Sequence, residues 1–158
     1  MADRDEINEF LNGSTGKAFP FDEIGDTVTG VIADMKKTQQ TDMDSGKPLF
    51  WDNGDPKMML RIVLETDLRD DDDDEGMRSV YLRGGNFTAA KGKGTSSLVA
   101  VKDAVRRSGS EKGIEIGGKL TMQYSGEGTK SNRGFSAPKL YTAAYESPSY
   151  GVDLDEMA

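Results

Sequence analysis

The chain has 158 residues, with 20 Lys and Arg against 28 Asp and Glu, a net charge of −8, and neither cysteine nor histidine. This composition excludes disulfide frameworks and thiolate metal sites, and it removes the commonest general base and metal ligand. No apolar run approaches the roughly 20 residues of a membrane span, and the acidic N-terminus has no apolar signal region, so we expect a soluble intracellular protein.

The charge is distributed unevenly along the chain. Three segments are acidic, with net charges of −5 over Met1–Asp26, −7 over Glu65–Glu75 and −4 over Glu146–Ala158. The segment Gly76–Tyr145 carries a net charge of +8, and Thr27–Leu64 is balanced. A polyanion would therefore be bound by the body of the protein rather than by the chain as a whole.

Residues 1–24 are predicted to form an N-terminal arm. Asp5–Leu11 favours a short helix with Ile7 and Phe10 on one face, and the Asn- and Gly-rich residues 12–16 end it. The arm is either loosely docked or a segment for partner binding or self-association.

The predicted body, residues 25–146, begins with a long strand over Thr27–Gln40, rich in Thr, Val and Ile. An Asn53-Gly54 pair then separates two extended segments, which is a strong hairpin signal. Met58–Glu65 alternates apolar and polar residues, so Leu64 and Arg61 are expected on opposite faces.

Asp67–Gly76 is predicted to be a charged turn, and Arg78–Arg83 the next strand. In that strand Tyr81 points outward if Val80 points inward, since a slip of one residue exchanges the two faces. The run Asp70–Glu75 lacks the spacing of a calcium loop or a two-metal site, so it is read as a solvated tip, with a weak magnesium site or a protein contact as alternatives.

A long loop over Gly84–Ser97 is expected before a helix over Ser97–Ser108. Ser96 or Ser97 caps the helix, two arginines complement its negative end, and Gly109 ends it.

Two further strands are predicted over Lys119–Tyr124 and Phe135–Tyr145, joined by a Gly-rich loop over Ser125–Gly134. Residues 147–158 combine Ser, Pro, Gly and acid, and are expected to be a disordered acidic tail.

Five strands with one helix between the third and the fourth correspond to the OB-fold, a partly open Greek-key barrel. The predicted fold class is therefore mainly β, a five-stranded OB-fold barrel. A small α+β sandwich is the competing arrangement.

Segments of the chain resemble one protein family. They are Gln40–Asp42, Gly46–Met58, Leu64–Asp67, Asp74–Arg78 and Pro138–Tyr141. The run formed by Gln40–Asp42 and Gly46–Met58 resembles the first loop of single-stranded DNA-binding proteins encoded by actinobacterial phages, and the other segments are similar to the same family. The resemblance covers roughly residues 25–145, and it implies an OB-fold that coats single strands during phage replication or recombination, in the cytoplasm of an infected bacterium.

No catalytic pattern accompanies this resemblance. A nucleophilic triad lacks its base, and the Gly-Lys pairs at Gly16 and Gly92 fail the phosphate-loop spacing. We therefore expect a binding protein that is not an enzyme and that needs no cofactor or metal.

A sequence-tolerant binder of single strands combines cations with aromatic stacking platforms, each stacked base contributing about 1–3 kcal/mol. On the predicted strands and loops of the body, the candidate DNA-binding residues are Lys47, Phe50, Trp51, Lys57, Arg61, Tyr81, Arg83, Phe87, Lys91, Lys93, Lys130, Arg133, Phe135, Lys139 and Tyr141. Each has an alternative role: Trp51 would otherwise close the barrel mouth, the aromatics of the last strand would pack in the core, and the cations would simply be solvated.

The acidic tail is the candidate partner-binding segment, through Val152, Asp153, Leu154, Asp155 and Glu156. Tails of this kind recruit replication or recombination proteins and compete for the DNA groove, although this one ends in Met157-Ala158 rather than in proline and an aromatic residue. A tail that only aids solubility is the alternative.

The sequence thus predicts a sequence-independent single-stranded DNA-binding protein, with homo-oligomerisation left open. The alternatives are an OB-type protein–protein adaptor anchored by Phe50 and Trp51, and an RNA-binding module.

Overall fold

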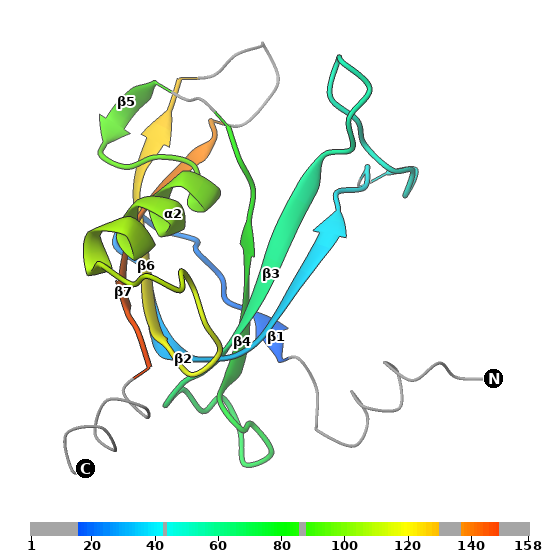
Figure 1. Ribbon diagram of the computed structural model, residues 1–158. Helices are drawn as coiled ribbons and strands as arrows, with labels where there is room; N and C mark the ends of the chain where they lie inside the picture. Colours follow the sequence, from blue (N-terminus) through cyan, green and yellow to red (C-terminus); the bar gives the residue numbers. More distant parts are fainter. Residues whose placement is uncertain (1–15, 43, 86–87, 130–136, 149–158) are drawn as a thin grey trace.

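The structure is a computed structural model that describes residues 16–42, 44–85, 88–129 and 137–148 (Figure 1). These residues form one curled β-sheet with a single helix packed against it. The elements, in chain order, are β1 (Lys17–Ala18), β2 (Thr27–Gln39), β3 (Met58–Glu65), β4 (Met77–Leu82), β5 (Ala89–Gly92), α2 (Ser97–Ser108), β6 (Lys119–Gly128) and β7 (Lys139–Glu146). No helix in this described part is long and apolar enough to cross a membrane.

The five longer strands pair in the order β4-β3-β2-β6-β7, and every pair is antiparallel. Short β5 pairs with the far end of β6, and β1 pairs in parallel with β4. Among the described residues no pairing joins β4 to β7, so the sheet curls into part of a barrel that stays open along this seam. The mainly β prediction is confirmed at this level.

The core lies inside the curl of the sheet. Its fully buried side chains include Ile32 from β2, Leu64 from β3, Leu82 from β4 and Leu120 from β6. Strand β2 changes phase at a bulge between Ile32 and Asp34, so that Ile32 and then Met35, three residues later, both face the core. Asp34, Lys36 and Thr38 are thereby turned to the outer face.

Helix α2 closes one side of the core, with Val101 and Ala104 buried. Ser96 is the N-cap and Gly109 ends the helix in the left-handed region at φ 75°, which confirms the predicted bounds. The Ser97 hydroxyl accepts a hydrogen bond from the Arg83 backbone N–H at 2.8 Å, so the helix is anchored to the end of β4.

Three predicted boundaries are corrected by the structure. A strand, β1, and the segment that follows it lie within the predicted arm, β5 lies within the predicted loop Gly84–Ser97, and β6 continues to Gly128 instead of ending at Tyr124. The sheet of the described residues therefore has seven strands rather than five. The two added strands are short and have no alternating pattern. Their extended conformation is determined by the strands with which they pair, so the sequence alone did not reveal them.

Candidate nucleic-acid interface

A row of three side chains crosses the outer face of the sheet. Lys36 on β2 lies opposite Arg61 on β3, and Arg61 lies opposite Tyr81 on β4. Tyr81 is 37% exposed while Val80 and Leu82 are buried, which confirms the predicted register. The Arg83 guanidinium lies 5.8 Å from the centre of the Tyr81 ring. This strand row (Lys36, Arg61 and Tyr81) therefore offers two cations and a ring, with a third cation at its end.

Arg61 has few polar partners of its own. Its Nη2 lies 3.8 Å from Oδ2 of Asp34, which is longer than a hydrogen bond. Its Nε is buried and has no hydrogen-bond partner among the described residues. Leaving a buried donor unsatisfied costs about 1–3 kcal/mol. Because this nitrogen is buried, an external ligand would meet only the exposed part of the Arg61 side chain, 20% of its surface.

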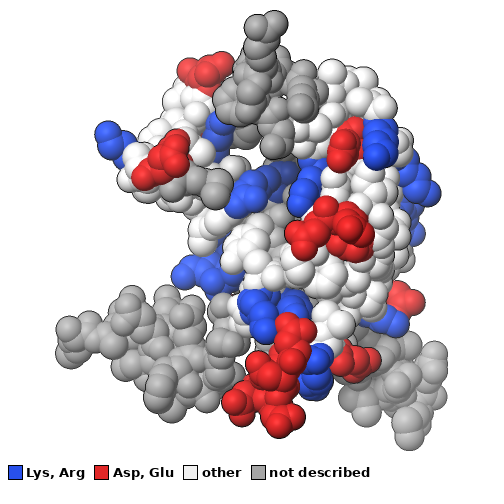
Figure 2. Space-filling model, turned by 180° about the vertical axis from the view of Figure 1, so that it is seen from behind, with Lys and Arg blue, Asp and Glu red and all other residues white. Residues whose placement is uncertain are grey.

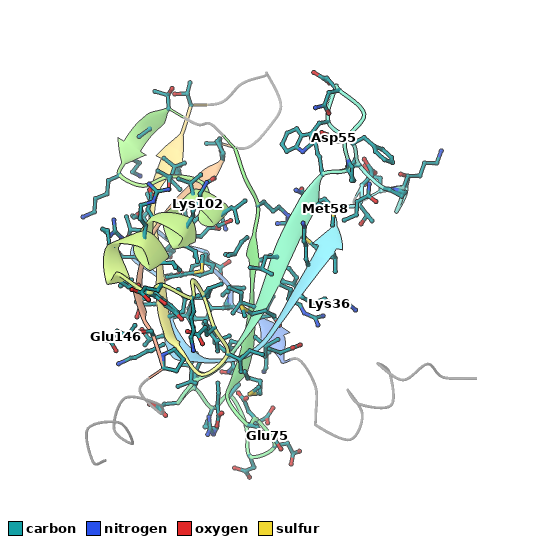
Figure 3. The ribbon with its side chains drawn as sticks, viewed as in Figure 1. Lys36, Asp55, Met58, Glu75, Lys102 and Glu146 are labelled. Atoms are coloured by element: carbon teal, nitrogen blue, oxygen red, sulfur yellow. The ribbon has the colours of Figure 1, made fainter. Side chains whose placement is uncertain are left out.

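A second cluster lies at the tip of the β2–β3 connection, which Asp55 marks in Figure 3. Phe50, Trp51 and Lys57 lie at the turn Trp51–Asp55, and Lys47 lies at a second turn of the same connection, Asp42–Lys47; these four residues are called the tip cluster. Phe50 is 56% and Trp51 47% exposed, and the Lys57 ammonium lies 4.7 Å from the centre of the tryptophan ring. These rings therefore project from the body instead of closing its mouth.

The backbone of this tip is a closed turn. The Trp51 N–H donates to the Asp55 carbonyl at 2.7 Å, Gly54 adopts φ 93°, and Phe50 bridges to Pro56. The predicted Asn-Gly turn is thus confirmed. The amide of Gln39 donates to the Leu49 carbonyl at 2.8 Å and braces the tip against the end of β2.

Lys139 and Tyr141 on β7 lie in the seam rather than on the outer face of β3 and β4. Tyr141 is half-buried, with its ring 5.1 Å from that of Phe21 and 6.1 Å from that of Tyr124. Burial raises the pKa of the Tyr141 hydroxyl, and the charge of Arg83 partly opposes this rise. The Lys139 ammonium lies 5.2 Å from the Tyr124 ring and donates a hydrogen bond to the Phe21 carbonyl.

The remaining candidates are spread elsewhere. Lys91 and Lys93 are exposed on and just after β5, where the Lys93 carbonyl accepts a hydrogen bond from the Ser125 hydroxyl at 2.7 Å. Several predicted residues lie outside the described part of the chain: Phe87, Lys130, Arg133, Phe135, Val152, Asp153, Leu154, Asp155 and Glu156.

The acidic β3–β4 connection lies at the opposite end of β3 from the tip cluster, as Glu75 and Asp55 show in Figure 3. One of its acids has a structural role. The Asp74 side chain is only 5% exposed and binds Arg78 at 2.6 Å, while its two oxygens accept backbone N–H groups of Asp70 and Gly76. The hydrogen bond to Arg78 is the main reason that the pKa of Asp74 lies far below its usual range.

The same network reaches the first strand. Lys17 on β1 pairs with Asp70 at 2.8 Å, and Asp70 lies 3.4 Å from Arg78. The acidic run is therefore partly neutralised within the structure and holds β1 against β4. Among the described residues, no cluster of three acidic side chains is arranged to hold a metal ion.

Figure 2 shows the face turned away from the viewer of Figure 1. Lys and Arg side chains cross its middle with Asp and Glu side chains among them, and the densest acidic group lies below, at the end that carries the β3–β4 connection.

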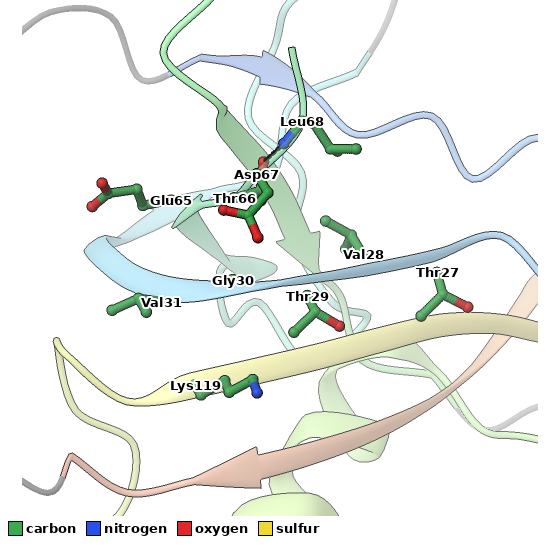
Figure 4. Close-up of a pocket in the computed structure, with 10 residues that line it drawn as sticks. All are labelled: Thr27, Val28, Thr29, Gly30, Val31, Glu65, Thr66, Asp67, Leu68 and Lys119. Atoms are coloured by element: carbon green, nitrogen blue, oxygen red, sulfur yellow. Dashed lines mark hydrogen bonds between the residues drawn. The ribbon is translucent and has the colours of Figure 1, made fainter.

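A separate groove of about 390 Å³ lies between β2 and the beginning of the β3–β4 connection (Figure 4). It is lined by Thr27, Val28, Thr29, Gly30, Val31, Glu65, Thr66, Asp67, Leu68 and Lys119. Its lining has one cation against two acids and contains no aromatic ring, so it does not fit a polyanion.

Sequence reasoning missed three residues of the candidate interface: Lys36 in the strand row, and Phe19 and Phe21 beside the seam. The bulge in β2 hid the outward position of Lys36, because simple alternation from Val28 would assign it to the core face. The two phenylalanines follow β1 and pack partly buried against the core, in a segment assigned to the arm. The spacing of two residues between Phe19 and Phe21, typical of an extended segment with one apolar face, was the sequence signal that could have placed them there.

Comparisons with models of protein families, with curated proteins and with solved structures found no match to this chain.

Proposed function

We propose that the chain is an OB-fold protein that binds single-stranded DNA without marked sequence preference, of the type that actinobacterial phages use in replication and recombination. The observation that carries the proposal is the strand row of Lys36, Arg61 and Tyr81, continued by Arg83 at one end. Cations beside an exposed ring on adjacent strands are what a sequence-tolerant single-strand binder requires.

The strand order supports the OB-fold part of the proposal. The first long strand, β2, pairs with both β3 and β6, the strand that follows the helix, and α2 lies between β4 and β6. An OB-fold binds on the face of its second and third strands, flanked by the first and last strand-connecting loops. These strands are β3 and β4, and the first loop carries the tip cluster.

Each group has a distinct task in the proposed complex. Phosphates lie beside Lys36, Arg61 and Arg83, so counterions are released and binding weakens with salt. Bases stack on Tyr81 and on Trp51 or Phe50, each contributing about 1–3 kcal/mol whatever the base.

Titration of the full chain with oligo-dT, followed by the fluorescence of Trp51, tests the proposal. Trp51 is the single tryptophan and is exposed, so stacking on it quenches the signal directly. We expect quenching and a gel shift at low salt that weaken as salt rises. An absence of both at low salt would refute the proposal.

A matched pair of variants tests the strand row. Tyr81→Leu removes the ring, and we expect DNA to bind about 5- to 140-fold more weakly, the loss of one stacked base. Tyr81→Phe keeps the ring and should bind within about twofold of the original chain. If DNA affinity is indifferent to Tyr81→Leu, the protein-adaptor alternative gains support, whereas a strong preference for oligo-U over oligo-dT favours the RNA-binding one.

A further inference from the structure

A cavity of about 260 Å³ lies at the open seam of the barrel, between β4 and β7. Its lining comes from three parts of the chain that are distant in sequence. The lining residues include Phe19, Phe21, Tyr81, Arg83, Lys139 and Tyr141. This seam pocket adjoins the strand row, because Tyr81 belongs to both.

One wall of the pocket is the segment that follows β1, residues 19–22, which crosses beside the seam in Figure 1. Rings stack edge to face along it, with 4.8 Å between the centres of Phe19 and Phe21 and 5.1 Å between those of Phe21 and Tyr141. The segment therefore supplies aromatic surface at the place where the strands leave a gap.

This wall is held at several points. The Phe19 N–H donates to the Ser79 carbonyl at 3.0 Å, and Lys139 donates to the Phe21 carbonyl. The Asp26 carboxylate accepts the N–H groups of Asp22 and Glu23 at 3.0 and 2.9 Å. The pocket is thus formed before any ligand arrives, which lowers the entropic cost of binding.

Two cations flank the aromatic surface. Arg83 lies on the β4 side, 5.8 Å from the centre of the Tyr81 ring, and lines the pocket together with Tyr141. Lys139 lies on the β7 side, over the Tyr124 ring. Asp22 is the one acidic residue of the lining, which leaves a net positive pocket.

We propose that the seam pocket binds a single nucleotide, with its base against Phe21, Tyr141 and Tyr81 and its phosphate at Arg83 and Lys139. This inference rests on the proposed function and deepens it. The volume lies just below the roughly 300–1,000 Å³ of drug-sized sites, so one planar base fits and a run of bases does not. A strand lying along the row would turn one base into the seam and be held there more firmly than on the open face.

Amide NMR spectra of the full chain during titration with dT12, and separately with dTMP, test the inference. We expect saturable shifts at Phe19, Phe21 and Ser79 with both probes, and shifts at Trp51 with dT12. Shifts confined to Trp51 and the strand row would overturn the inference that the seam pocket binds a nucleotide, and would leave the proposed function intact. An absence of any binding of dT12 would overturn both.

A pair of lysine variants on the same strand pairing provides the matched control. Lys139→Gln removes the seam cation, and we expect dTMP to bind about tenfold more weakly, as for a lost hydrogen bond to a charged group. Lys119→Gln removes an exposed cation at the other end of the β6–β7 pair and should change the affinity less than about twofold. Equal effects of the two variants would overturn the assignment of the phosphate to Lys139.

A phenylalanine variant separates the contact from the fold. Phe21→Leu keeps an apolar side chain in the wall but removes the ring. We expect dTMP, followed by the amide shifts at the seam, to bind about fivefold more weakly or more. The amide spectrum and the midpoint of thermal unfolding report whether the wall stays in place. Unchanged dTMP affinity in a folded Phe21→Leu chain would overturn the stacking role.

Discussion

Asp34 is the acidic residue that most directly opposes the proposed interface. Its carboxylate lies 3.8 Å from the Arg61 guanidinium on the outer face, and its side chain is 54% exposed. The isosteric change Asp34→Asn removes this charge and keeps the shape. We expect it to tighten the binding of single-stranded DNA.

The magnitude follows from the geometry. A phosphate that contacts Arg61 on its free side would lie about 7 Å from the Asp34 carboxylate, roughly twice the measured separation. The repulsion at that distance is about 0.6 kcal/mol in water and about twice that at an effective dielectric constant of roughly 40. Removing it strengthens DNA binding about three- to sevenfold.

The change should leave the fold almost untouched. An exposed ion pair contributes about 0.2–1 kcal/mol, so the midpoint of thermal unfolding should fall by only a few degrees at most. The expected phenotype is therefore a gain in affinity without a gain in stability.

Fluorescence anisotropy of a labelled oligo-dT measures the effect, at about 50 mM and about 200 mM salt. The gain should shrink at the higher salt, because the screening length falls to roughly the separation of the charges. Asp103→Asn is the matched control, since Asp103 also lies 3.8 Å from an arginine, Arg106, but on helix α2 away from the strand row. Equal affinities of the two variants would refute the assignment of Arg61 to a phosphate.

Three further outcomes are expected. Asp74→Asn should lower the midpoint of urea unfolding at pH 7. The difference in midpoint from the original chain should narrow as the pH falls below about 4, because the lowered pKa of Asp74 contributes its full stability only above the unfolded pKa and loses it progressively below. A difference that stays constant down to pH 2.5 would contradict this role. Gly94→Ala should lower the free energy of unfolding by about 1–3 kcal/mol, since its Cβ would lie 2.5 Å from the Ser125 Oγ. Gly113→Ala is the control and should cost clearly less, because there is open space around Gly113. Equal costs would count against a steric clash at Gly94. Deleting residues 147–158 should tighten DNA binding at low salt if the acidic tail competes for the interface, and unchanged affinity would leave only recruitment or solubility as its role.

The parts of the fold that were predictable are those with a strong local pattern. Met58–Glu65 was placed at its observed bounds, and the buried Val80 and Leu82 fixed the outward position of Tyr81. The helix was bounded by a serine cap and a terminal glycine, both local signals. In each case neighbouring residues alone determined the conformation.

The parts that were missed depend on distant partners. The wall of the seam pocket is held by Ser79 and by Lys139, which lies 118 residues from Phe21 along the chain. Strand β5 exists because β6 extends beside it. The role of Asp74 depends on Arg78 being buried at the end of β4, and nothing in a run of five aspartates distinguishes one member from the others.

The net charge of −8 is compatible with DNA binding because of where the charges lie on the barrel. The acidic β3–β4 connection is at the far end of the sheet from the tip cluster, and part of it is neutralised by Lys17 and Arg78. The connection that carries the tip cluster, residues 40–57, contains four aspartates against Lys47 and Lys57, a net charge of −2, so it contributes stacking rather than positive charge.

The phosphates should therefore be neutralised mainly by the strand row and the seam, through Lys36, Arg61, Arg83 and Lys139. Three or four such contacts predict that the logarithm of the binding constant falls with the logarithm of salt at a slope of about −2 to −3. Stacking on the rings should leave measurable affinity at about 0.5 M salt, since it releases no counterions. A slope near −6, measured by Trp51 quenching across a salt series, would mean that the lysines of the tip and of β5 also contact phosphates, and it would refute this division between charge and stacking.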